Sequence, residues 1–141
     1  MATYVSKEYA QDVLNAVVGT IYTGDIEVAL LKSAPEITNG TLSITGKELS
    51  TSTDEGYDRI AVAVEDFSAA TGNNPAYLSN DNDLYTDYNS GVDNWQSINY
   101  VALLSGTKVL MCIETAAPVS IAPSRRVRIP AGSLVLRMGS A

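Results

Sequence analysis

Apolar residues recur along this chain with two different periods, and the first segment is the one with helical spacing. Between residues 6 and 19 the apolar positions one helical face apart are Ala10, Val13, Leu14, Val17 and Val18. Ser6 suits the N-cap of such a helix, and Gly19 suits its C-cap. The pattern predicts one N-terminal helix over about residues 6–19.

The rest of the chain has the two-residue period of strands. In "DIEVALLKSAP" the alternate residues Ile26, Val28 and Leu30 share one face, and Pro35 ends the run. The stretches "YDRIAVAVEDF", "RRVRI" and "SLVLRM" alternate in the same way. "SINYVALL" and "KVLMCIE" flank "SGT", a three-residue loop with a central glycine, which is the clearest hairpin signal. Residues 36–56, rich in Ser, Thr and Gly, predict a long loop with a short strand near residues 42–44.

These elements predict a mainly β protein. Several short strands joined by Gly and Pro turns favour an antiparallel sandwich or barrel, and we expect a jelly-roll-like β-sandwich. With 141 residues, no visible linker and no internal repeat, we expect a single domain over residues 1–141. The β-sandwich would occupy about residues 25–139, and the helix would cover one end or edge.

The charge of the chain is negative and unevenly distributed. The net charge is −7, which argues against a nucleic-acid or anionic-membrane binder, since both require clustered basic residues. Residues 54–94 carry a net charge of −8, whereas residues 95–141 carry +4. The two segments could complement each other within one chain or between copies, or could simply be solvated. No signal peptide or membrane-spanning run is visible, so we expect a soluble protein made in a reducing cytoplasm.

The residue types of most enzyme sites are missing. The chain has no histidine, so it has no Ser-His-Asp triad and no histidine zinc site. Its single cysteine, Cys112, lies in the apolar run "VLMCIE" and is expected to pack as a small hydrophobe. Glu65 and Asp66 are adjacent on a strand, so they point to opposite faces and cannot share a glycosidase site. We therefore expect no enzymatic activity, no catalytic residue, no metal and no cofactor.

The acidic stretch "NDNDLYTDYNSGVDNW", residues 80–95, offers three interpretations. Asp87, Asn89 and Asp93 resemble the spaced oxygens of a calcium loop, but Val92 stands where an EF-hand needs glycine and Ile98 where it needs glutamate. Asn, Asp, Ser and Gly also favour ordinary turns. Tyrosines in a polar loop are typical of protein contact surfaces. We therefore predict that residues 73–94 form an exposed contact loop.

The candidate contact residues are the tyrosines and some carboxylates of this loop, together with a basic cluster near the C-terminus. They are Tyr77, Tyr85, Asp87, Tyr88, Asp93, Arg125, Arg126 and Arg128. If the arginines meet the acidic segment of a neighbouring copy, assembly weakens as salt rises. Another interpretation is a glycan-binding module in which Tyr85, Tyr88 and Trp95 stack on sugar rings.

The order of these motifs resembles a family of small structural proteins of tailed bacteriophages, described as tail-fibre-like or minor virion proteins. Their early strand reads roughly "VALFTAAP", matched here by "EVALLKSAP". Their later "GYARQAV" is matched by "GYDRIAVAV" after Glu48. A tryptophan then precedes a hairpin, as Trp95 does here, and "IPAGSLVLRM" matches the closing turn and strand. The resemblance covers about residues 7–138, although the 38–53 and 68–94 segments are longer here than the family pattern.

This resemblance implies an all-β virion component without enzymatic activity, made in the cytoplasm of the host bacterium. Two locations are consistent with it: the outer capsid, as a cement or decoration protein, or the tail, as a fibre-like or adaptor protein. The compact length without fibrous repeats favours the capsid surface. The expected partners are the major capsid protein, or tail proteins, of the same phage and further copies of the chain, with a homotrimer favoured; nucleic acid and membrane are not expected partners.

Overall fold

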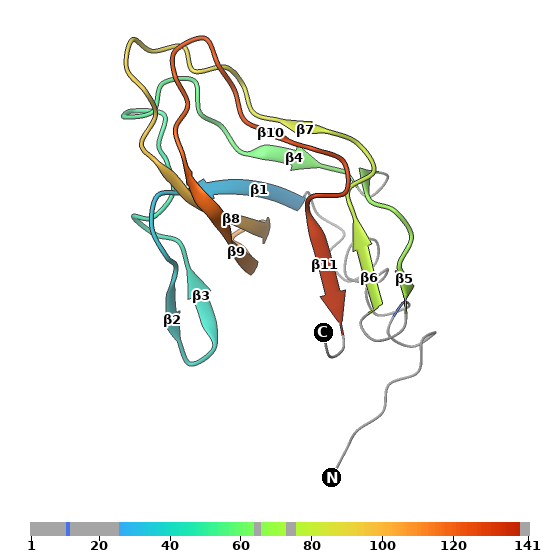
Figure 1. The fold of residues 1–141 in the computed structure, drawn as a ribbon. Coiled ribbons are helices and arrows are strands. Elements are labelled where there is room, and N and C mark those ends of the chain that lie inside the picture. The colour runs from blue at the N-terminus through green and yellow to red at the C-terminus, as the bar shows by residue number, and fades with distance from the viewer. Residues whose placement is uncertain (1–10, 12–25, 64–65, 73–75, 139–141) are drawn as a thin grey trace. The chain divides into compact units, whose positions relative to one another are not determined.

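The computed structural model describes residues 11, 26–63, 66–72 and 76–138 (Figure 1). The protein is mainly β, with antiparallel pairing within its four-stranded sheet, its three-stranded sheet and one further hairpin, as the alternating sequence pattern predicts. The predicted helix over residues 6–19 lies outside the described residues except for Gln11. The chain divides into two compact units: the first holds the described residues of 1–24, 63–84 and 129–141, and the second holds residues 25–62 and 85–128.

The second unit is built on a four-stranded antiparallel sheet with the order β4-β1-β8-β9. Its strands are β1 (Ile26–Leu31), β4 (Ile60–Val62), β8 (Ile98–Ser105) and β9 (Lys108–Val119). The central strand β1 is almost wholly apolar because both faces of the sheet are covered. Leu30 packs with one buried cluster, whereas Ala29 and Leu31 pack with another, so successive residues serve opposite faces.

The β8–β9 hairpin confirms the prediction from "SINYVALL" and "KVLMCIE". Ser105 pairs with Lys108, so the connection is a two-residue turn of Gly106 and Thr107 rather than the predicted three-residue loop. Gly106 has a φ of 60°, which glycine adopts without steric penalty. The pairing shifts between Leu103 and Leu104, which marks a bulge in this hairpin.

The long loop predicted after Pro35 is wrong in one respect, because it contains a second hairpin. Strands β2 (Glu36–Thr38) and β3 (Thr41–Ser43) pair around an Asn-Gly turn. Asn39 and Gly40 have φ values of 51° and 76°, the left-handed pair that a two-residue hairpin turn favours. Ile37 pairs with Leu42 across this ribbon and its surface is 69% exposed.

The first unit contains a three-stranded sheet with the order β11-β6-β5, formed by β5 (Thr71–Gly72), β6 (Ala76–Ser79) and β11 (Val135–Met138). Buried Asn80 follows β6 and joins it to the chain before β11. Its side-chain amide donates to the carbonyl oxygens of Asn82 and Pro130, and its side-chain oxygen accepts from the Leu134 N–H. A final two-stranded pair joins β7 (Leu84–Tyr85) and β10 (Arg128–Ile129).

Candidate contact surface

Three of the predicted contact residues meet on the surface of the second unit. The guanidinium carbon of Arg126 lies 3.9 Å from the centroid of the Tyr85 ring and 4.7 Å from that of Tyr88. Tyr85 is 41% exposed and Tyr88 is 54% exposed, and Arg126 is exposed as well. Arginine stacked on tyrosine is attracted by the ring quadrupole, so the three side chains form a pre-ordered surface cluster. We call these three residues the Tyr-Arg-Tyr cluster.

The backbone under this cluster is fixed by buried Asn89. The Asn89 side-chain amide donates to the carbonyl oxygens of Asp93 and Ile121, at 2.9 and 3.0 Å, and its side-chain oxygen accepts from the Gly91 N–H at 2.9 Å. The Asn89 main chain also exchanges hydrogen bonds with Arg125 and Ser124. Asn89 is 2% exposed and all of its polar side-chain atoms are paired, so it holds residues 89–93 against the 121–125 segment.

Val92 is exposed within this fixed segment, between Gly91 and Asp93, and is not one of the predicted contact residues. With 89% of its surface exposed, it is the most exposed large hydrophobic side chain of the described residues. Single exposed apolar residues are common, but this one sits within a turn whose ends are both hydrogen-bonded to Asn89. The signal that would have found it is a β-branched apolar residue between Gly91 and Asp93 in an otherwise polar stretch.

A loop formed by residues 54–57 also contacts this segment, since the Ser90 N–H donates to the Glu55 carbonyl oxygen. A Cβ at Gly56 would overlap the carbonyl oxygen of Tyr88, so only glycine permits this close approach. Buried Asp54 accepts hydrogen bonds from the main chain and side chain of Gln96. Trp95 donates its indole N–H to the carbonyl oxygen of Glu55 and is 2% exposed.

The placement of Trp95 corrects one interpretation and supports another. Because it is buried against Tyr57, with ring centroids 5.9 Å apart and an angle of 86°, it cannot stack on a sugar ring as the glycan interpretation required. It is a core residue that precedes the β8–β9 hairpin, as the sequence motif indicated. Arg126 also covers one side of the Tyr85 and Tyr88 rings. The glycan interpretation therefore loses Trp95, whereas Tyr85 and Tyr88 remain partly exposed.

The structure also changes the picture of the predicted contact loop. Residues 73–94 were expected to form an exposed loop, but this stretch contains β6 and β7 and buries Leu78, Asn80, Leu84, Thr86 and Asn89. The reason is that its polar residues satisfy distant backbone groups instead of water. For example, Thr86 accepts through its hydroxyl from the Val127 N–H. Exposed positions are interspersed with buried ones, so the stretch packs on the protein through one side and is exposed on the other.

The remaining predicted contact residues are exposed but differ in place. Asp87, Asp93 and Arg125 lie in the same unit as the Tyr-Arg-Tyr cluster, and exposed Arg128 lies in β10. Tyr77 is 45% exposed on β6, in the other unit. The acidic and basic segments lie side by side within one chain, since the backbones of 86–89 and 124–127 are hydrogen-bonded. This adjacency makes complementation within the chain possible at this site.

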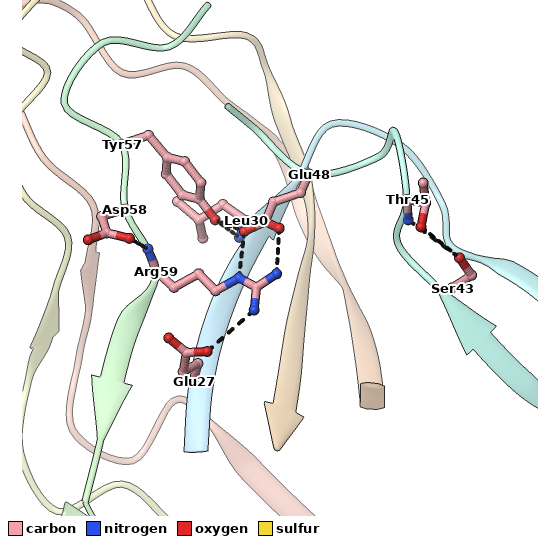
Figure 2. Close-up of polar contacts among 8 residues, drawn as sticks. All are labelled: Glu27, Leu30, Ser43, Thr45, Glu48, Tyr57, Asp58 and Arg59. Carbon is pink, nitrogen blue, oxygen red and sulfur yellow. Dashed lines mark hydrogen bonds and ion pairs between the residues drawn. The ribbon is translucent and has the colours of Figure 1, made fainter. Parts of the chain in front are cut away.

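A second polar cluster lies on the sheet of the same unit and is centred on Arg59 (Figure 2). Arg59 donates two hydrogen bonds to the Glu48 carboxylate, each of 2.9 Å, and forms a longer ion pair of 3.3 Å with Glu27. The Tyr57 hydroxyl donates to Glu48 at 2.6 Å and accepts from the Leu30 N–H at 3.1 Å. Glu48 thus connects the loop before β4 to the central strand β1.

The ionisation of this cluster follows from its contacts. Burial alone would raise the pKa of Glu48, but hydrogen bonds from Arg59 and Tyr57 outweigh it and hold that pKa below its ordinary value. Burial, and then the hydrogen bond to Glu48, raise the pKa of Tyr57. The Glu48 hydrogen bond raises the pKa of Arg59. All three groups keep their usual neutral-pH charge states, so the cluster is a structural clamp with no general acid or base poised near neutrality.

A surface pocket of about 600 Å³ lies beside this clamp. Its apolar lining includes Leu42, Ile44, Leu104 and Val109, and its polar lining includes hydroxyl groups and the side chains of Lys32, Glu48 and Arg59. The Ser43 and Thr45 hydroxyls in the lining are hydrogen-bonded to each other at 3.3 Å (Figure 2). The pocket thus combines an apolar wall with a polar rim.

The residues considered for calcium binding and for thiol chemistry, Asn89 and Cys112, make structural contacts. In the possible calcium pattern, the Asn89 oxygen is already bonded to the Gly91 N–H. Among the described residues no three acidic or cysteine side chains cluster closely enough to hold a metal ion. Cys112 is partly buried beside an apolar cluster, and burial raises the pKa of its thiol. Within the described ranges no helix is long and apolar enough to cross a membrane.

No family model and no curated protein matches the chain. The resemblance to phage structural proteins therefore rests on the sequence motifs themselves.

Proposed function

We propose that this chain is a non-enzymatic structural protein of a tailed bacteriophage particle, which binds the outer capsid surface as a cement or decoration protein. In this role it stabilises contacts between major capsid proteins and acts as a homo-oligomer, with a trimer favoured. Within the proposal, its strands form a jelly-roll-like sandwich and residues 6–19 form a helix. The order of sequence motifs from residue 7 to residue 138 supports the phage assignment.

The observation that carries the contact role is the exposed Tyr-Arg-Tyr cluster on a rigid backbone. Tyrosine and arginine are enriched at interface hot spots, where they provide large contact area together with hydrogen-bond donors. Asn89 and Gly56 fix the backbone beneath Tyr88, so little conformational freedom is lost when a partner binds. A decoration protein sums many such modest contacts over the many copies on a capsid.

The copy number in purified phage particles tests the location. A capsid decoration protein is expected to be present at a copy number that matches the capsid lattice. A few copies per particle, together with loss of adsorption when the protein is deleted, would support the tail-associated alternative instead. Absence from purified particles would overturn the virion role altogether.

The contact surface is tested by adding purified protein to particles that lack it. Replacing Tyr85 and Tyr88 together by alanine, or Arg126 by alanine, is expected to reduce capsid binding at least about tenfold, as for hot-spot residues. Arg126→Lys should recover little, because lysine lacks the planar group that stacks on both rings. Val119→Ala, at an exposed position of β9, is the matched control. Unchanged binding by all of the cluster variants would remove this surface from the proposal.

A further inference from the structure

The two most exposed large hydrophobic side chains of the described residues, Val92 and Ile37, lie in different parts of the second unit. Val92 is 89% exposed on the Asn89-fixed turn, and we call residues 91–93 the knob. Ile37 is 69% exposed on the β2–β3 hairpin and is paired with Leu42, which lines the 600 Å³ pocket. Directly paired residues lie on the same face of a hairpin, so Ile37 is an exposed apolar neighbour of the pocket residue Leu42.

We propose that the knob of one copy of this chain docks into the pocket of a second copy. The apolar Val92 side chain would meet the wall formed by Ile37, Leu42 and Val109. The knob exposes an apolar side chain, and the pocket offers an apolar lining that can bury it. The inference supplies an interface for the homo-oligomer in the proposed function and rests on that part of it.

Charge complementarity identifies a second copy as the occupant. The knob carries the exposed carboxylate of Asp93, whereas the pocket lining carries Lys32. Arg59 in the same lining is already paired with Glu48 and Glu27, but in the described part of the chain no ion pair involves Lys32. The Thr45 hydroxyl in the lining accepts from Ser43, so its own O–H can donate a hydrogen bond to an incoming carboxylate.

A closed ring is the type of assembly that we propose. In a ring the knob-pocket contact is heterologous, and successive copies add head to tail until the ring closes. A closed ring of three copies uses every knob and every pocket. A twofold dimer would instead make the knob-pocket contact twice, reciprocally, and would have two chain masses.

The mass of the purified full chain in solution, measured by light scattering and sedimentation, provides the first test. The wild-type protein is expected to have three chain masses. The knob variant Val92→Asp and the pocket variant Ile37→Asp/Lys32→Glu should each dissociate at least about tenfold more readily. The knob variant loses apolar burial and places a carboxylate against apolar side chains, whereas the pocket variant loses apolar burial and faces Asp93 with like charge. Val119→Asp, at another exposed valine, is the matched control and should retain the wild-type mass. All of these substitutions are at the surface, and circular dichroism checks that each variant is folded.

Mixing the two defective variants provides a sharper test. The knob variant keeps an intact pocket and the pocket variant keeps an intact knob, so their mixture should form a one-to-one complex of two chain masses. A monomeric wild-type protein, variants with unchanged mass, or a mixture that does not associate would each overturn the proposal. Capsid binding by the monomeric variants separates this inference from the capsid role, because either can fail while the other holds.

Discussion

Removing the Asn89 side chain tests whether this one residue holds the contact segment in place. Asn89→Ala eliminates three hydrogen bonds of 2.9 to 3.0 Å that join the side chain to Gly91, Asp93 and Ile121. Each such bond contributes roughly 0.5–1.5 kcal/mol net, so the free energy of unfolding should fall by about 3 kcal/mol. The Ile121 carbonyl oxygen still accepts a hydrogen bond from the main-chain N–H of Trp95, so it is not left without a partner.

The sole tryptophan supplies the assay, because buried Trp95 belongs to the same unit as Asn89. With a urea m-value of about 2 kcal/mol/M, the loss should lower the fluorescence midpoint by about 1.5 M. Asn94→Ala is the control, since Asn94 is exposed and its side chain makes a single 3.2 Å bond to Ser120. A change below about 0.5 kcal/mol for Asn89→Ala would refute the anchoring argument.

Asn89→Asp distinguishes lost hydrogen bonds from lost volume. The two side chains have almost the same size, but an ionised carboxylate cannot donate to the carbonyl oxygens of Asp93 and Ile121. At neutral pH this variant should therefore be at least as unstable as Asn89→Ala. Lowering the pH restores one O–H donor, so its stability relative to the wild-type protein should rise in the same urea assay. A deficit that does not depend on pH would contradict this explanation.

Three further changes probe the supports of the sheet and loop. Tyr57→Phe leaves a β1 backbone N–H without its acceptor and should lower the free energy of unfolding by about 1–3 kcal/mol in urea. Glu48→Gln weakens the Arg59 clamp and should lower the free energy of unfolding relative to wild type. Because the folded pKa of Glu48 lies below its ordinary 4.5, this difference in free energy should be complete at pH 7 and should shrink as the pH falls through the folded pKa. A gap that widens in acid would contradict this sign. Gly56→Ala places a Cβ against a carbonyl oxygen at a φ of 88° and should lower the free energy of unfolding by more than about 3 kcal/mol or prevent folding. The control is Gly40→Ala, which lies in open space at a φ of 76° and should lower it by only about 1 kcal/mol. Equal losses would show that the close contact is unimportant.

The strands that could be predicted from the sequence are those that carry apolar residues into a core. β1 and the β8–β9 hairpin have runs long enough to be recognised. Burial of both faces explains the near-continuous hydrophobicity of β1 and β8, whereas β9 is only partly buried. β3 overlaps the short strand predicted near residues 42–44, but the sequence pattern does not predict β2 or its pairing with β3. The two strands have three residues each and are largely exposed, so no alternating burial pattern marks them. The Asn39-Gly40 pair was the signal, and it was overlooked in a stretch rich in Ser, Thr and Gly.

The candidate site was predictable in its residue types and unpredictable in its architecture. Tyr85, Tyr88 and Arg126 were all selected from composition, yet their stacking depends on pairing between segments about 40 residues apart. Asn89 was taken as a possible metal ligand, but its real partners include Ile121, a distance in sequence that no local pattern encodes. Long-range hydrogen bonding by single polar residues thus explains most of the difference.

The asparagine anchors also set an order of events during synthesis. Asn80 bonds to residues 130–134 and Asn89 to residues 121–125, so both lack their partners until that later stretch has left the ribosome. Before then, the turn that carries Val92 is not joined to residues 121–125. If the proposed knob-pocket contact holds, nascent chains on one messenger cannot make it in its final form until the later stretch has been made.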